Sequence, residues 1–223
     1  MKLVFFVLCL VSLAGNTQSL TRYVQPLSGT APSTTISAKK HSEAGSKESN
    51  ANTIPSVGTP FGMTQWVAQT RTTEVKCQPP YYYKDSLLSG FRGTHWISGS
   101  CTQDYGSVTI MPVTGSLRTS LKEYSIPFSH VNEITGPSYY KLSLPDAGLI
   151  AEMTGTARCG VLQFTMTRDD SLYLLIIPNS DFGKGMVAVN KSDGTITGSN
   201  PVHRIYQGWG RKPDLKDGFI SSR

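Results

Sequence analysis

The sequence has 223 residues, which suits one sizeable domain with tails, and its 21 glycines, 13 prolines and 10 tyrosines favour an all-β protein over a helical one. The net charge of +6 comes from scattered Lys and Arg, with two short basic clusters at Lys39–Lys40 and Arg211–Lys212. Because no basic stripe is interleaved with aromatic residues, this composition argues against nucleic-acid binding.

The N-terminus has the pattern of a secretory signal peptide. Lys2 is followed by the apolar run Leu3–Leu13, then by the small residues Ala14 and Gly15. The run is too short to span a bilayer, so we prefer a signal peptide over residues 1–19 to the alternative of an uncleaved anchor. The mature chain is therefore predicted to be secreted or to reside in the lumen of the secretory pathway, with no membrane association after cleavage.

Cysteine pairing stays open at this stage. Cys9 lies in the signal peptide, which leaves Cys77, Cys101 and Cys159. In an oxidising compartment two of these three thiols are able to pair. Their spacing does not resemble a zinc site, so no metal ligands are assigned.

The first part of the mature chain alternates short structured and polar segments. Thr21–Pro26 is typical of a short strand, and residues 31–52 have the composition of a flexible, solvated insertion. Thr53–Trp66 is predicted to be a constrained loop that leads into a strand. The aromatic cluster Tyr81–Tyr83 fits core or edge packing better than a ligand platform.

Gly90–Pro112 is the most chemically varied stretch. It begins as a polar, glycine-punctuated loop and ends in Val108–Met111, a β-branched run that predicts a strand. The loop carries His95 and Trp96, and a flat ring beside polar groups suits the apolar face and polar rim of a sugar. The alternative is a sandwich loop whose tryptophan caps the core.

Downstream, strands recur at short intervals. The predicted strands are Tyr140–Leu144, Leu149–Thr156, Val161–Met166, Leu172–Ile177 as a central strand, and a hairpin of Met186–Val189 with Thr195–Thr197 around Asp193-Gly194. One short peripheral helix is expected near Ser116–Glu123. The sequence thus predicts an all-β fold, a β-sandwich of mostly antiparallel strands with long loops over residues 20–210, followed by a polar tail over residues 211–223.

Asn190-Lys191-Ser192 lies between the two strands of that hairpin and matches the acceptor motif for N-linked glycosylation. A hairpin tip is exposed enough to carry a glycan, so Asn190 is a candidate modification site.

Five segments carry motifs in a recognisable order. They are Tyr23–Thr30, with Gln25 and Ser28 as departures from Val-Asn-Pro-Phe-Ile-Gly-Thr; Asn52–Pro55 with Pro60–Met63; Gly90–Trp96 with Asp104-Tyr105-Gly106; Tyr139–Leu142 with Ile150–Thr154; and Pro201–Gly210. Together they resemble the N-terminal domain of glycoside hydrolase family 92, the α-mannosidases. The resemblance covers Tyr23 to about Gly210.

The resemblance implies that catalysis and sugar binding are shared between two domains. Family members are similar in packing an N-terminal β-sandwich on a helical (α/α)₆ domain, and they remove terminal α-mannose from N-glycans or mannans by exo-acting, calcium-dependent, inverting hydrolysis. The family's catalytic carboxylates come from the helical domain. This chain is therefore expected to lack catalytic residues, to partner that missing domain and mannose-containing glycans, and to bind no calcium itself. No acid–base pair is assigned among the visible carboxylates, which are Asp85, Asp104, Glu123, Glu152 and Asp181.

The resemblance also implies candidate site residues. Trp96 is expected to stack on a sugar and His95 to hydrogen-bond to it, with Phe61 and Gly62 as an adjacent wall. Asp104 and Tyr105 are expected to brace the loop. Gly93 stands where the family often has a histidine, and two alternatives remain, namely a structural His95 and a simply packed turn at residues 59–62.

The resulting hypothesis is an N-terminal sandwich domain or fragment of a secreted α-mannosidase, forming one wall of the sugar cleft. The alternatives are a free-standing, non-catalytic carbohydrate-binding sandwich and an interaction domain without a ligand, whose apolar face would be exposed.

Overall fold

The computed structural model describes residues 20–41, 51–71, 77–100, 104, 106, 108–179, 185–202 and 215–221. The predicted signal peptide, Cys101 and Tyr105 lie outside the described residues. In the part of the chain that is described, no helix has the length and apolar character needed to cross a membrane.

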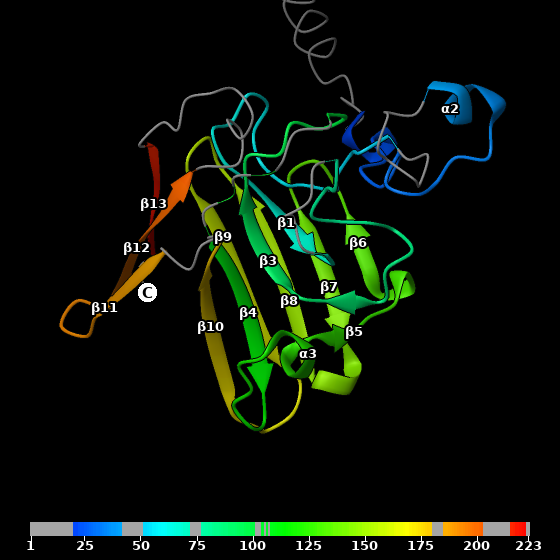
Figure 1. Ribbon diagram of the computed structural model, residues 1–223. Coiled ribbons are helices and arrows are strands. Elements are labelled where there is room, and N and C mark those ends of the chain that lie inside the picture. Colours follow the sequence, from blue (N-terminus) through cyan, green and yellow to red (C-terminus); the bar gives the residue numbers. More distant parts are fainter. Residues whose placement is uncertain are drawn as a thin grey trace, which may run out of the picture.

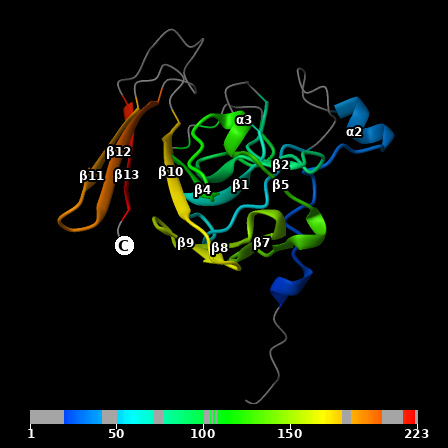
Figure 2. The ribbon, with the colours of Figure 1, turned by 90° about the horizontal axis from the view of Figure 1, so that it is seen from below.

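Two four-stranded antiparallel sheets form the body of the molecule. The first sheet has the order β1-β3-β4-β10 and the second β6-β7-β8-β9. Figure 2 shows the two sheets as facing layers. The predicted all-β sandwich is confirmed. The strands of the first sheet are β1 (Gln65–Gln69), β3 (Gly90–Thr94), β4 (Val108–Thr114) and β10 (Leu172–Pro178), and those of the second are β6 (Glu133–Thr135), β7 (Tyr140–Leu144), β8 (Leu149–Gly155) and β9 (Gly160–Met166).

Smaller elements surround this sandwich. A third antiparallel sheet, of order β11-β12-β13, stands beside β10 (Figure 1), and β2 pairs with β5. These strands are β11 (Met186–Asn190), β12 (Thr195–Val202), β13 (Leu215–Ser221), β2 (Leu87–Leu88) and β5 (Ile126–Pro127), and the helices are η1 (Leu20–Tyr23), α2 (Ile36–His41), α3 (Leu121–Tyr124), η2 (His130–Asn132) and η3 (Pro145–Ala147).

The core lies between the two large sheets and follows from side-chain alternation. On β7 the side chains of Tyr140, Leu142 and Leu144 are buried, and the residues between them are half-buried. Successive side chains on a strand point to opposite faces, so this pattern turns one face of β7 toward the other sheet. Phe91 of the first sheet meets Phe164 of the second with ring centroids 5.7 Å apart. The predicted strand and its inward face are confirmed.

The segment Gly90–Thr94 is a strand, which corrects the prediction of a loop. All five residues of β3 are buried, and the strand pairs with β1 on one side and β4 on the other. The strand is hard to recognise from the sequence because it contains the charged Arg92 and two glycines, Gly90 and Gly93. The charge is tolerated because a carboxylate from a later loop pairs with it, as described below.

Strand β4 continues past Pro112, where the prediction ended it. The β3 ladder reaches only Val108–Ile110 of β4, whereas β10 pairs with the whole strand through Thr114. Pro112 therefore lies where β4 has one described neighbour, the position in a sheet at which a missing N–H is tolerated.

Strand β10 corrects a second prediction, because it is an edge strand of the first sheet instead of a central one. Its apolar run suggested burial on both faces, yet Tyr173 is 39% and Leu174 50% exposed. These two neighbouring side chains point to opposite faces of the sheet, so each face is partly open to solvent at this position.

The N-terminal and C-terminal segments differ from prediction in three places. Leu20–Tyr23 forms a 3₁₀ helix where a strand was predicted, and Ile36–His41 of the proposed insertion forms a helix. Leu215–Ser221 of the proposed polar tail forms a strand paired with β12. The short helix expected near Ser116–Glu123 is present as α3. The predicted hairpin is confirmed, since β11 pairs with β12 up to the pair Asn190–Thr195.

Candidate functional site

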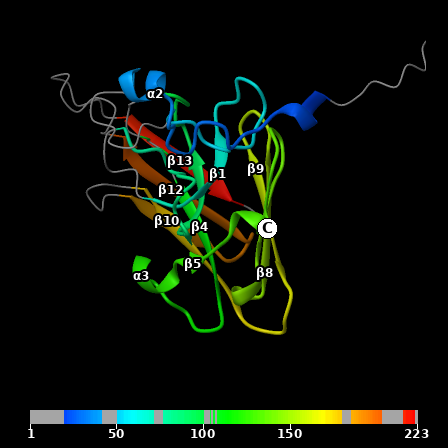
Figure 3. The same ribbon diagram turned by 90° about the vertical axis from the view of Figure 1, so that its right-hand side faces the viewer.

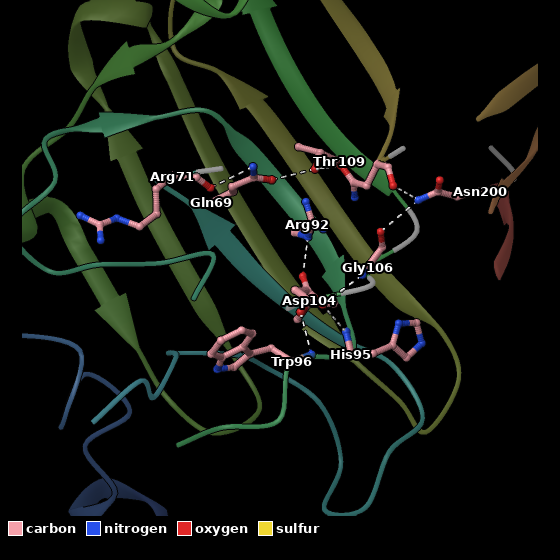
Figure 4. A network of polar contacts seen from close by, with 11 residues as sticks. Gln69, Arg71, Arg92, His95, Trp96, Asp104, Gly106, Thr109 and Asn200 are labelled. Carbon is pink, nitrogen blue, oxygen red and sulfur yellow. Dashed lines mark hydrogen bonds and ion pairs between the residues drawn. The ribbon is translucent and has the colours of Figure 1, made fainter. Parts of the chain in front are cut away.

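Asp104 anchors the loop that follows β3. Its fully buried carboxylate lies 2.5 Å from Arg92 Nε and accepts the backbone N–H of His95 at 3.2 Å and of Gly106 at 3.0 Å (Figure 4). One side chain thus connects the strand, the start of the loop and its end. This is a bracing position, the kind expected for Asp104, whereas Tyr105 lies outside the described residues.

Because it is buried, the Arg92–Asp104 ion pair is important for the stability of the fold. The side chains are 2% and 0% exposed, so both charges have left water and depend on each other. The backbone closes tightly over the pair at Gly106, where an added Cβ would lie 2.4 Å from the Gly93 carbonyl oxygen and 2.7 Å from Arg92 Nε. Only glycine fits there.

Trp96 is a core residue, which corrects its predicted role as an exposed sugar platform. Its side chain is 4% exposed and belongs to the hydrophobic core, and the indole N–H donates to the Asn52 carbonyl oxygen at 2.8 Å. A ring enclosed in this way presents no face for a sugar. The alternative reading, a tryptophan that caps the core, describes it correctly.

His95 is half-buried, and its backbone N–H is held by Asp104. Figure 4 shows the His95 and Trp96 side chains directed to opposite sides of Asp104. The two residues predicted to hold one sugar together therefore diverge, and His95 is the one left near the surface.

Phe61 and Gly62 form a turn of their own. Gly62 N–H donates to the Thr59 carbonyl oxygen at 3.0 Å, and Met63 N–H donates to the Ala157 carbonyl oxygen at 2.7 Å, which seats the turn on the β8–β9 hairpin. Phe61 is fully exposed and has a left-handed φ of 59°. The described contacts fit a packed turn and leave the Phe61 ring open to a ligand or a partner surface.

A buried polar network extends from the Asp104 loop to the third sheet. The Thr109 hydroxyl hydrogen-bonds to Gln69 Oε1 at 2.8 Å and to Asn179 Oδ1 at 3.0 Å. Asn200 of β12 donates its side-chain amide to the Asn179 carbonyl oxygen, and also to the Gly106 carbonyl oxygen at 3.4 Å (Figure 4). Sequence reasoning missed these residues, because they lie up to 131 positions apart and belong to no motif.

A second buried cluster centres on Glu133, whose side chain is 0% exposed. Its carboxylate accepts from the hydroxyls of Tyr81 at 2.9 Å and Tyr140 at 2.7 Å, and lies 2.7 Å from His130 Nδ1. The His130 ring also stacks on Tyr83 with centroids 3.9 Å apart. Burial, then the negative charge of Glu133, raises the pKa of both the Tyr81 and Tyr140 hydroxyls far above the ordinary range.

This Glu133 cluster explains the aromatic run Tyr81–Tyr83, which was predicted to pack in the core or at an edge. Tyr81 and Tyr82 are buried, and Tyr83 is 37% exposed. The cluster ties this segment to β6 and β7 of the second sheet. In the sequence, the cluster is visible only as an aromatic run and, separately, as a histidine three residues before a glutamate. Neither pattern predicts that the two segments are in contact.

The visible carboxylates are occupied by structural contacts. Asp85 accepts two hydrogen bonds from the Arg71 guanidinium at 2.8 Å each, and Glu123 accepts the Ser120 hydroxyl at 2.5 Å. Glu152 accepts the Tyr139 hydroxyl. Asp181 lies outside the described residues. Among the residues with described coordinates, no three His, Cys, Asp or Glu side chains gather in a way that could hold a metal ion.

Cys77 is disulfide-bonded, and its partner lies outside the described residues. Cys159 is a free, exposed thiol. The pairing that the sequence left open is thus narrowed, since Cys159 takes no part in it.

Comparison with known proteins gives one family. The family model for the glycosyl hydrolase family 92 N-terminal domain matches residues 23–216. The chain is similar in structure to the family GH92 inverting mannosidase BT2199 of Bacteroides thetaiotaomicron, at 29% identity and a TM-score of 0.66, covering 84% of this chain and 23% of that one. It is also similar to the GH92 alpha-mannosidase BT3965 of the same organism, at 28% identity and a TM-score of 0.69, covering 92% and 26%. BT3965 has also been solved in complex with mannoimidazole.

The GH92 family glycosyl hydrolase ccman5 shares the fold at 22% identity and a TM-score of 0.59, covering 81% of this chain and 24% of that one. No curated protein matches this chain. The chain spans about a quarter of the length of the mannosidases that it resembles.

Proposed function

Because this chain belongs to glycosyl hydrolase family 92, as its N-terminal domain, we propose that it forms one wall of the sugar-binding cleft of a secreted, exo-acting α-mannosidase. The reaction would be inverting removal of terminal α-mannose from N-glycans or mannans. The match over residues 23–216 carries the proposal, and BT2199, one of the similar structures, is an inverting mannosidase.

The braced loop supports a role in the cleft. Asp104 accepts the backbone N–H groups of His95 and of Gly106 and so ties the start of the loop to its end, which holds the half-buried imidazole on a rigid support. Binding residues are commonly presented in this way, on loops positioned by a scaffold. His95 would hydrogen-bond to the sugar, and the open Phe61 ring would form a more distant part of the wall.

The state of the carboxylates supports a non-catalytic role for this domain. An inverting glycosidase needs an acid and a base roughly 6.5–9.5 Å apart, with room between them for a water and the substrate. The buried carboxylates Asp104 and Glu133 each face a basic side chain, and Asp85 is held by Arg71. The acid and base, and the calcium expected in the family, would therefore come from a helical domain.

The third sheet supports the presence of such a partner. All five residues of β11 are exposed, and these include Met186 at 67%, Val187 at 38% and Val189 at 64%. These side chains alternate between the two faces of the sheet, so neither face is covered along β11. The exposed Leu174 of the edge strand β10 adds to this surface. Apolar surface of this kind is typical of an interface.

A domain exchange tests the proposal. The N-terminal domain of BT3965 is replaced by residues 20–221 of this chain, and hydrolysis of an aryl α-mannoside is measured for the chimera, the remaining BT3965 domain and this chain alone. We expect turnover only in the chimera. Turnover by this chain alone, or a folded chimera with no activity, would contradict the proposal.

A pair of variants in the chimera tests the role of the loop. His95→Ala is expected to raise KM about 10-fold or more through loss of a substrate hydrogen bond, and Ile97→Ala serves as the control because Ile97 is an exposed neighbour. Equal KM values would remove His95 from the cleft. Calorimetry of this chain alone with mannose and mannobiose separates the cleft wall from a free-standing binding module, since only the latter predicts measurable affinity.

A further inference from the structure

The tip of the β11–β12 hairpin carries a feature that the proposed function does not use. Strand β11 ends at Asn190, β12 begins at Thr195, and these two residues form the last pair of the ladder. In Figure 1 this hairpin projects away from both large sheets. Asn190, Lys191 and Ser192 are all exposed.

Asn190-Lys191-Ser192 is the only Asn-X-Ser/Thr motif without a central proline in the 223 residues. The other six asparagines lack a hydroxyl residue two positions later. The chain therefore offers a single acceptor for an N-linked glycan, and any such glycan reports on one site.

The local hydrogen bonds arrange the acceptor amide and the hydroxyl of the motif together. Ser192 Oγ donates to Asn190 Oδ1 at 2.7 Å, and Ser192 N–H donates to the same oxygen at 3.1 Å. Asn190 Nδ2 donates to Asp193 Oδ2 at 2.8 Å. The carbonyl side of the amide thus faces the serine, and the nitrogen side faces a carboxylate.

Asp193 keeps the tip in this conformation. Its Oδ1 accepts the Thr195 hydroxyl at 2.6 Å and the Thr195 N–H at 2.9 Å. The hydrogen bond from the Thr195 hydroxyl, and then that from the Thr195 N–H, lower the pKa of the exposed Asp193 carboxyl. These hydrogen bonds all lie within residues 190–195 and Ser192 is exposed, so a substitution at Ser192 is expected to leave the sandwich core untouched.

From the motif, its exposure and this arrangement, we propose that Asn190 is N-glycosylated in a eukaryotic secretory pathway. Asn190 Nδ2 attacks C1 of the first sugar of a lipid-linked oligosaccharide pyrophosphate. The Nδ2–C1 bond forms, the bond from C1 to the phosphate oxygen breaks, the lipid pyrophosphate leaves, and the amide proton passes to a base of the transferase. The glycan then projects from an exposed hairpin tip.

The glycan would sit at the end of an edge strand. Among the described strands β11 has a neighbour on one side only, and it carries the exposed Val187 and Val189. Edge strands of this kind are prone to pair with other chains, and bulky polar groups hinder such pairing. The modification would thus shield an exposed apolar strand.

The test is expression of the full chain, behind a secretion signal of the host, in a eukaryotic secretory host. We expect peptide N-glycosidase to increase the electrophoretic mobility of the product and to convert Asn190 to aspartate, as read by peptide mass. Ser192→Ala is expected to abolish the modification, and Ser192→Thr to retain or increase it. An exported wild-type chain with unmodified Asn190, or equal glycan occupancy in the alanine variant, would overturn the proposal.

Exporting the chain on a host signal separates this outcome from the predicted signal peptide, and the assay uses no mannoside. A negative result therefore leaves the proposed mannosidase role unaffected, and a failed domain exchange leaves the glycosylation site unaffected.

Discussion

Two buried residues, Asp104 and Glu133, organise much of the polar interior. Each is a carboxylate with 0% exposure of its side chain and a basic partner, which is Arg92 for Asp104 and the nearby His130 for Glu133. Burying a charge is costly unless it is paired and hydrogen-bonded, so each partner stabilises the other only while both are present. Substitutions at these centres are therefore expected to act on folding first.

Asp104→Ala is expected to lower the free energy of unfolding by about 3–5 kcal/mol, because it leaves the Arg92 guanidinium buried without its closest anion. Urea unfolding followed by circular dichroism measures the change. Asp170→Ala is the control, since the Arg168–Asp170 pair is partly exposed and 3.6 Å apart, and should cost at most about 1 kcal/mol. Similar losses in the two variants would show that the Asp104 pair has no special role.

Tyr140 gives the domain a predicted sensitivity to alkali. Burial, then the charge of Glu133, raises the pKa of its hydroxyl well above the ordinary value of about 10. Above that pH the tyrosine of the unfolded chain ionises while that of the folded chain stays protonated. The folded state then binds more protons, and the free energy of unfolding falls as pH rises.

Tyr140→Phe is expected to cost about 1–3 kcal/mol at pH 7, because Glu133 loses a buried donor. It should also make the fall in stability above pH 10 shallower than in the wild type. Urea unfolding curves collected from neutral to alkaline pH measure both effects. An unchanged alkaline slope would contradict the assignment of this sensitivity to Tyr140.

At the scale of elements, the two large sheets are joined by side chains that reach from one to the other. Trp66 of β1 packs directly over the backbone of Gly160 at the start of β9. This contact requires glycine, since an added Cβ would lie 2.0 Å from Trp66 Nε1 and 2.4 Å from Cδ1. Here a glycine inside a strand marks a close approach between layers.

Gly160→Ala is therefore expected to destabilise the domain by about 1–3 kcal/mol, as is usual when a packed site is overfilled. The displaced indole should also change the tryptophan emission spectrum of the folded protein. Gly58→Ala is the matched control, because its nearest contact is 3.5 Å away and an added methyl group fits. A wild-type stability for Gly160→Ala would show that the indole moves away freely.

At the scale of the whole molecule, the two large sheets pack on each other, whereas strand β11 of the third sheet is left exposed. The core residues come from the two large sheets and the segments beside them, whereas β11 is exposed along its length. The aligned part of this chain covers 23% and 26% of two of the similar mannosidases. The proposed function therefore includes docking of a further domain on the exposed apolar side chains of β10 and β11, which are Leu174, Met186, Val187 and Val189.

This surface also predicts self-association of the isolated chain. Sedimentation is expected to show association that increases with protein concentration, and Val189→Lys to reduce it, because a charge on an edge strand opposes pairing between copies. Val131→Lys is the control, since Val131 is 91% exposed but lies in a 3₁₀ helix. A monomer at all concentrations, or equal effects of the two variants, would contradict the prediction.

The sequence by itself determined the local features of this protein. Alternation defined β7, the Asp193-Gly194 pair defined the hairpin, and motifs from Tyr23 onward indicated the family. Each of these signals is contained in a few neighbouring residues, or in the order of such groups, so no tertiary contact is needed to find it.

Only the tertiary structure decided where those elements lie and what surrounds them. It placed Trp96 in the core, where the indole N–H donates a hydrogen bond to the backbone carbonyl of Asn52, 44 positions away. It also placed β10 at the edge of a sheet. It also paired Arg92 with Asp104 and brought Tyr81 to Glu133. Burial and charge pairing depend on residues that are distant in sequence. From the sequence alone, Trp96 and Arg92 are therefore equally compatible with a buried structural role and with an exposed ligand contact.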